Sequence, residues 1–138
     1  MSDLAFQSAT DLAKGIQKKT FSSLELTELY IDRIEQRDGE INAVVVRIFD
    51  RALDDARNAD ATLARGENLG PLHGVPMTIK EAYNIEGLPT TWGYPEFREN
   101  IADSDADSVT RLKEAGAVFF GKTNVPLSLP DFQSFNEV

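Results

Sequence analysis

The strongest constraint on the fold is an uninterrupted apolar run, 117-AVFF-120, that directly follows a segment with helical character. A run of this kind is typical of a strand that is buried on both faces of a sheet. The preceding helix is predicted to begin with Asp105 as its N-cap residue and to end at Gly116. A second strand is predicted from Val75 to Lys80, where apolar residues follow a loop rich in glycine and proline. This alternation of helices and strands predicts an α/β fold, a sheet covered by helices.

The first half of the chain predicts helices around one strand. Ser8 and Ser22 are each followed three residues later by an acidic residue, which is the spacing of a capping box at the start of a helix. The second helix carries an apolar stripe interrupted by one arginine: Leu26, Leu29, Tyr30, Arg33 and Ile34. The β-branched segment 41–47 predicts a strand, and a helix with a face of small residues follows it: Ala52, Ala56, Ala59 and Leu63.

Composition excludes several classes of function. The 138 residues carry a net charge of −9, so no basic surface is expected to bind nucleic acid or an anionic membrane directly. The absence of cysteine excludes disulfides and thiolate chemistry, and the single histidine, His73, excludes a multi-histidine metal site. The segment 41–49 is too short to cross a bilayer, and the first residues lack the pattern of a secretory signal. We therefore expect a cytoplasmic protein without a metal or cofactor.

One motif matches a known pattern in an unsuitable context. Residues 116-GAVFFGKT-123 fit the phosphate-loop pattern G-x-x-x-x-G-K-[ST], which would make the chain a nucleotide binder. In a phosphate loop, however, a strand precedes the first glycine and a helix follows the motif, whereas Gly116 here follows a helix and precedes a strand. We therefore expect a helix end, a buried strand and an exposed Lys122.

Other candidate residues have a structural and a functional interpretation. His73 lies in a glycine-rich loop, where a local hydrogen-bonding role is favoured over catalysis. Trp92 and Tyr94 lie in the long aromatic loop 84–97 and would either line a pocket or cover the sheet. The acidic groups at 54–55 and 103–107 are expected to be solvated, because they lack the pattern of a calcium loop.

Lys80 is the residue that most directly suggests chemistry. It ends the predicted strand of 75–80, and open α/β sheets place ligands and catalytic groups at the carboxyl ends of strands. A strand-end lysine that reaches solvent is the commoner case, so this position alone leaves both interpretations open.

The residues around Lys80 carry a resemblance to the amidase signature family. The segment 70-GPLHGVPMTIKEAYNIEGLPTTWG-93 is similar to that family's G-P-L-x-G-[VI]-P-x-x-[IV]-K-[DE] block, and 105-DADSVTRLKEAGAVFFGKTNVP-126 resembles its helix–strand–G-K-T-N continuation. The resemblance implies a mixed sheet sandwiched between helices and a Ser–cis-Ser–Lys triad that hydrolyses or transfers carboxamide C–N bonds. It assigns the role of the triad base to Lys80. A lysine accepts a proton only when neutral, and we expect burial at the strand end to favour that form.

The sequence departs from the family pattern where the two serines are concerned. Nothing in it reads G-G-S-S-G, and the serines at 104, 108, 128 and 134 stand in other blocks. Glu81 replaces the more usual Asp, and Trp92 stands where small residues are common, so substrate-binding residues stay unknown. We expect the N-terminal part of an amidase that is inactive by itself.

The resemblance and its alternatives lead to further expectations. One amidase domain would comprise a helical part (1–40), a first strand and helix (41–66), the lysine-bearing strand and loop (70–97), a helix and strand (105–121) and a tail (122–138). A free-standing amidase acting on a small-molecule amide is favoured over an amidotransferase component, and a homodimer of the full-length enzyme is left open. The alternatives are a non-catalytic interaction module and, less favoured, the nucleotide binder of Gly116–Thr123.

Overall fold

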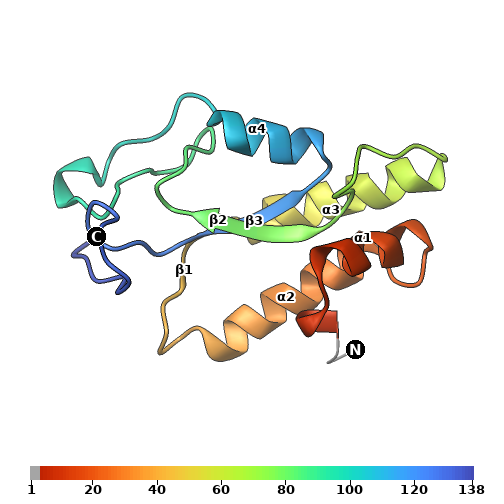
Figure 1. Cartoon of the computed structure of the whole chain (residues 1–138), viewed down its shortest axis with the longest axis horizontal. Coiled ribbons are helices and arrows are strands. Elements are labelled where there is room, and N and C mark those ends of the chain that lie inside the picture. Colours follow the sequence, from red (N-terminus) through yellow and green to blue (C-terminus); the bar gives the residue numbers. More distant parts are fainter. Residues whose placement is uncertain (1–3) are drawn as a thin grey trace.

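The computed structural model describes residues 4–138, which form a three-stranded sheet with helices packed around it (Figure 1). The central strand is β3 (Val118–Thr123). It pairs antiparallel with β1 (Val44–Arg47) and parallel with β2 (Pro76–Lys80). The predicted α/β class is confirmed, and the sheet is mixed as the resemblance implied.

Four α-helices of the described residues surround the sheet: α1 (Ala9–Gln17), α2 (Ser23–Arg37), α3 (Phe49–Ala64) and α4 (Asp107–Glu114). In Figure 1, α1 and α2 lie below the sheet, α4 lies above it and α3 runs behind it. Short 3₁₀ turns occur at Leu4–Phe6 and Pro95–Phe97. None of the helices in residues 4–138 combines the length and hydrophobicity that a transmembrane segment requires.

Both predicted capping boxes are helix starts in the structure. The Ser8 hydroxyl accepts a hydrogen bond from the Asp11 N–H at 3.1 Å and caps α1. At α2, the Ser22 hydroxyl accepts from the Glu25 N–H at 3.0 Å, while the Glu25 carboxylate accepts from the Ser22 N–H at 2.8 Å. Asp60 of α3 accepts from the next two backbone N–H groups of α2, which sets one helix against the other.

The predicted start of α4 is wrong. The helix begins at Asp107, and its N-cap residue is Ala106, which makes no side-chain hydrogen bond. The Asp105 carboxylate instead accepts hydrogen bonds from the Lys113 ammonium and from the Glu86 N–H. Burial alone would raise the pKa of Asp105, but these two bonds outweigh it and keep the pKa below its usual value. An ion pair thus replaces the cap, because a charged donor is the stronger partner.

The apolar face of α2 is wider than the predicted stripe. Leu26 is fully buried as expected, but Ile31 is buried although it lies outside the stripe, and Tyr30 and Ile34 are only partly buried. The helix contributes to two core clusters, one with α1 and the start of β2 and one with α3 and β3. A helix between two neighbours buries a broader surface than a single stripe describes.

Small residues let α3 lie close to its neighbours, as predicted. Ala52, Ala56 and Ala59 are buried, and Ala52 and Ala56 pack with Phe120 of β3. The ring of Phe120 stacks on that of Tyr30 from α2, with a centroid distance of 6.1 Å. The core below the sheet is therefore formed by two helices and the central strand together.

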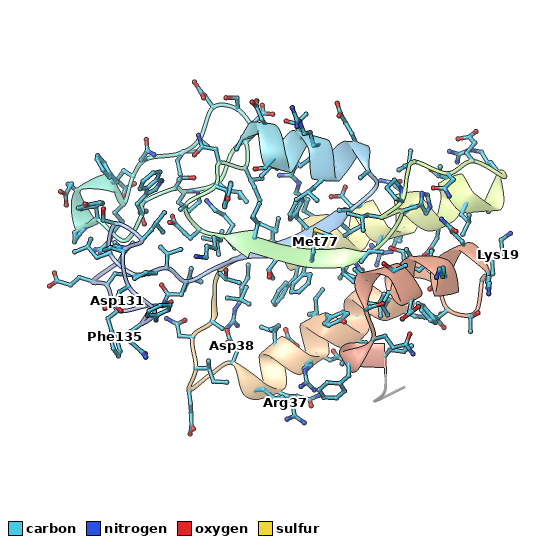
Figure 2. All side chains as sticks on the ribbon, in the orientation of Figure 1. Lys19, Arg37, Asp38, Met77, Asp131 and Phe135 are labelled. Atoms are coloured by element: carbon cyan, nitrogen blue, oxygen red, sulfur yellow. The ribbon has the colours of Figure 1, made fainter. Side chains whose placement is uncertain are left out.

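The central strand is longer than the sequence predicted. It extends to Thr123, and all its residues from Val118 to Lys122 are buried. The predicted burial on both faces is confirmed, and it continues past the apolar run because both neighbouring strands cover the edges of β3. On the edge strand β2, Met77 (labelled in Figure 2) packs against two core clusters, one with α1 and α2 and one with α4.

Candidate functional site

Lys80 is the last residue of β2, and its backbone is fixed while its side chain is free. The Glu81 N–H donates to the Thr123 carbonyl at 2.8 Å, and the Lys80 carbonyl accepts from the Tyr83 N–H at 3.0 Å. The side chain itself is exposed, and among residues 4–138 nothing forms a hydrogen bond or ion pair with its ammonium group. The burial that the resemblance implies for Lys80 is therefore not provided by residues 4–138, because no described element covers the strand end on that side.

The residue after Lys80 holds a loop in place. Glu81 is 5% exposed, and its carboxylate accepts hydrogen bonds from the N–H groups of Thr91 (2.6 Å) and Trp92 (3.0 Å). Side chains alternate along a strand, so the carboxylate of Glu81 and the amine of Lys80 point to opposite faces. The long loop 84–97 thus folds back against the strand end that carries Lys80.

Lys122 is buried, and the expectation of an exposed side chain is wrong. It has no exposed surface, and its ammonium donates to the Pro89 carbonyl and, at 2.9 Å, to the Thr90 hydroxyl. Burial lowers the pKa of Lys122 to about 8, and the nearby Glu81 carboxylate opposes only part of that effect. The strand pattern around Gly121 and Lys122 gave no sign of this, because the covering loop lies more than thirty residues earlier in the chain.

The phosphate-loop interpretation does not fit the geometry of residues 116–123. Gly116 ends α4 with a φ of +93°, and a Cβ there would lie 2.7 Å from the Cα of His73. The following residues form the extended β3 rather than a loop of inward N–H groups, and the Lys122 ammonium already has two acceptors. The motif is a helix end and a strand, as predicted.

His73 has a structural position. It is fully buried; its Nδ1 accepts from the Leu69 N–H at 3.1 Å, and its Nε2 lies 2.9 Å from the Ala59 carbonyl. Since Nδ1 accepts a hydrogen bond, Nε2 carries the proton and donates to α3. Both nitrogens are occupied, which supports the predicted non-catalytic role and extends it from a local turn to an anchor for the loop before β2.

The aromatic residues of the long loop take different positions. Trp92 is 45% exposed and has a φ of +55°, so its indole does not form part of the sheet's cover. Its carbonyl accepts from the Ser128 N–H at 3.0 Å, which joins the loop to the C-terminal segment. Tyr94 packs edge-on against Phe97 and lines an open hollow of about 510 Å³. The loop and this segment gather at the carboxyl end of β2, on the left in Figure 1.

Two other hollows adjoin the sheet. One, of about 290 Å³, lies between α3 and α4 and has charged groups beside an apolar floor that includes Phe119. The second, of about 280 Å³, is bordered by Glu81, Arg98 and Asn124. Lys80 lines neither of them.

The acidic groups are only partly solvated as expected. Asp54, Asp55, Asp103 and Asp107 are exposed, whereas Asp105 is partly buried in its ion pair. Within residues 4–138, no three side chains of the types that bind metals lie close enough together to hold an ion.

Comparison with known proteins connects this site to one family. The family model described as Amidase matches residues 25–136. A glutamyl-tRNA(Gln) amidotransferase component of Moorella thermoacetica is 44% identical over 123 residues, which are 89% of this chain and 25% of that protein. An acylamidase of Rhodococcus erythropolis is 40% identical over 126 residues, covering 91% of this chain and 26% of the relative.

Solved structures give the same result. A fatty acid amide hydrolase superposes with a TM-score of 0.85 and 31% identity, covering 95% of this chain and 23% of the other. A peptide amidase from Stenotrophomonas maltophilia superposes with a TM-score of 0.80 and 31% identity, covering 88% of this chain and 25% of the other. The chain spans about a quarter of the length of the relatives it matches. Sequence, fold and strand-end lysine together show that the chain belongs to the amidase signature family.

Proposed function

We propose that Lys80 is the base of a Ser–cis-Ser–Lys triad. We also propose that residues 1–138 are the N-terminal part of a single amidase domain. The observation that carries the proposal is the position of Lys80. It ends β2 inside the segment matched by the family model, with a fixed backbone and an amine without a partner among the described residues. A base must be both held in place and free to accept a proton.

The reaction class follows from the chemistry of amides. An amide is a weak electrophile with a poor leaving group, so a covalent acyl-enzyme divides one difficult step into two. Lys80 would draw the proton from the nucleophilic serine through the second serine and later return a proton to the leaving amine. Within residues 4–138, no serine side chain is hydrogen-bonded to Lys80. We propose that these 138 residues do not hydrolyse amides by themselves.

The preferred substrate is a small-molecule carboxamide, and the protein is a free-standing cytoplasmic amidase without a metal or cofactor. The net charge of −9 supports this choice over an amidotransferase component, because an acidic chain offers no surface of its own for tRNA. Relatives of both kinds match at similar identity, so identity does not separate the two functions. An activity assay does. Ammonia released from simple carboxamides without an acceptor supports the free-standing enzyme.

A chimera tests the role of Lys80. Residues 25–136 replace the matching segment of the Rhodococcus erythropolis acylamidase, and hydrolysis of its amide substrate is followed with and without Lys80→Met. We expect an active chimera whose kcat/KM falls about a thousandfold or more in the variant, as for the loss of other triad members. Arg57→Met is the control, because it removes one positive charge from an exposed site on α3. Full activity of the Lys80→Met chimera would refute the proposal.

A further inference from the structure

Two side chains from neighbouring strands hold one short segment of the long loop. Lys122 of β3 donates to the Pro89 carbonyl and the Thr90 hydroxyl, and Glu81, which follows β2, accepts from the N–H groups of Thr91 and Trp92. Four consecutive residues are thus bound by one cation and one anion. We call residues 89–92 the held segment.

The two charged groups are too deeply buried to be explained by stability alone. Lys122 is 0% exposed and Glu81 is 5% exposed. Removing a charge from water is costly, and buried charged groups are often no more stabilising than apolar side chains of the same size. The advantage of the two charged groups is geometric, because donors and acceptors in fixed directions allow only one arrangement of the held segment.

The residues on either side of Lys80, Ile79 and Glu81, are both bound to Thr123. The Glu81 N–H donates to the carbonyl of Thr123, the residue after Lys122, and the Thr123 hydroxyl approaches the Ile79 carbonyl at 3.4 Å. The Lys80 backbone therefore lies between two residues that are tied to the end of β3. Any shift of the held segment is transmitted to Lys80 through the side chain of Glu81.

We propose that Lys122 and Glu81 are positioning residues that lock the held segment against the end of β2 and thereby fix the backbone from which Lys80 projects. The inference rests on the proposed role of Lys80 as the triad base and adds the residues that orient it. Lys122 acts through the loop and not on the substrate, because its side chain is fully buried and donates to two groups of the held segment.

Amide hydrogen exchange on the 138-residue chain tests the first part of the proposal. The variants are Lys122→Met, Glu81→Gln and the milder Thr90→Val, which removes one acceptor of Lys122 with little change in shape. We expect the Thr91 and Trp92 amides to exchange about tenfold faster or more, while amides inside α3 keep their protection. The Glu81 and Tyr83 amides, which follow Lys80 and donate to the Thr123 and Lys80 carbonyls, should accelerate with them.

Fluorescence provides a second measurement, because Trp92 is the only tryptophan of the chain. In each variant we expect the emission of Trp92 to move toward that of the unfolded chain and acrylamide to quench it more strongly. Lys113→Met serves as the control, since it removes a different hydrogen-bonded lysine, the partner of Asp105, away from the held segment. It should lower stability without changing the emission of Trp92.

Chemical rescue separates the amine from its packing. The chain has no cysteine, so Lys122→Cys introduces a single thiol, which can be alkylated with 2-bromoethylamine in urea to give a lysine analogue. After refolding, we expect wild-type exchange at Thr91 and Trp92 in the aminoethylated protein and fast exchange in the unmodified variant. Lys113→Cys receives the same treatment as a control for the procedure.

The outcomes distinguish this inference from the proposed function. If the Thr91 and Trp92 amides accelerate but those of Glu81 and Tyr83 do not, the held segment does not position Lys80 and the inference fails. It fails also if Thr90→Val and Lys122→Met both leave all four amides unchanged. Neither result bears on whether Lys80 is the base, because that is decided by the activity of the Lys80→Met chimera.

Discussion

The buried ammonium of Lys122 leads to a quantitative prediction about stability. Burial lowers its pKa from 10.5 to about 8, so the folded state releases this proton at a lower pH than the unfolded chain does. A difference of this size corresponds to about 3 kcal/mol against the charged form in the folded protein. Near neutral pH the native state is therefore less stable by that amount than it would be with a neutral lysine.

The sign of the pH dependence follows from proton binding. Between pH 8 and 10.5 the unfolded chain binds more protons at this residue than the folded chain does, so the free energy of unfolding rises with pH. This rise in the free energy of unfolding is complete only above the pKa of Lys122 in the unfolded chain. Lys122→Met has no such term, and other titrating groups are common to both proteins. The difference in stability between wild type and variant should therefore shift toward wild type by about 2 kcal/mol between roughly pH 7.5 and 9.5.

Urea denaturation followed by far-ultraviolet circular dichroism measures this difference at several pH values. The lost hydrogen bonds to Pro89 and Thr90 add a cost to the variant that is independent of pH to first order, so the slope and not the offset carries the information. A difference that stays flat across this range would show that Lys122 is not buried as a cation. Lys113→Met, at a partly exposed ion pair, is the control.

Three further substitutions test the fold. Gly121→Ala should lower the free energy of unfolding by about 1–3 kcal/mol in urea titrations, because a Cβ would lie 2.6 Å from Val44 Cγ1. Gly39→Ala is the control and should be close to neutral, since nothing lies within 4 Å of a Cβ there. Asp38→Asn should lower the free energy of unfolding by about 1–3 kcal/mol near pH 7, and this difference should shrink as acid titrates the wild type. Burial raises the pKa of Asp38, but its hydrogen bonds outweigh burial and lower the pKa below 3.8. The stability that the carboxylate contributes is therefore present above that value and lost as the pH falls through the folded pKa. Ser22→Ala should cost about 1 kcal/mol, measured as a lower thermal midpoint.

The sequence predicted those features that depend on residues close together in the chain, such as helix starts and the buried strand. The capping signals at Ser8 and Ser22 are local hydrogen-bond patterns; both serines are N-caps in the structure, and Ser22 forms the full capping box with Glu25. The continuous apolar run of 117–120 requires burial on both faces, and β3 is the central strand. The family resemblance was carried by two blocks of sequence and is confirmed by the match to residues 25–136.

The errors concern contacts between residues far apart in the chain. Asp105 fits an N-cap by position, but Lys113 and Glu86 compete for its carboxylate in the folded chain. Asp38 is not an error but a contact that the sequence did not indicate: it lies at the end of α2 (Figure 2) and is 3% exposed, and it accepts two backbone N–H groups of the following segment and pairs with Arg47. Propensity scales treat such a residue as a helix end and do not show how its charge is satisfied.

The two lysines of adjacent strands show why residue type and strand position do not by themselves identify the functional one. Lys80 is exposed at its strand end, whereas Lys122, paired with Ile79 in the sheet register, is buried. Burial and a lowered pKa are commonly taken as signs of a catalytic base, and by that criterion Lys122 would be chosen. Lys122, however, has no exposed surface, and its ammonium donates to Pro89 and Thr90 within the fold. Our proposal of Lys80 as the base rests instead on its exposed amine and anchored backbone, an arrangement that leaves the amine available for proton transfer.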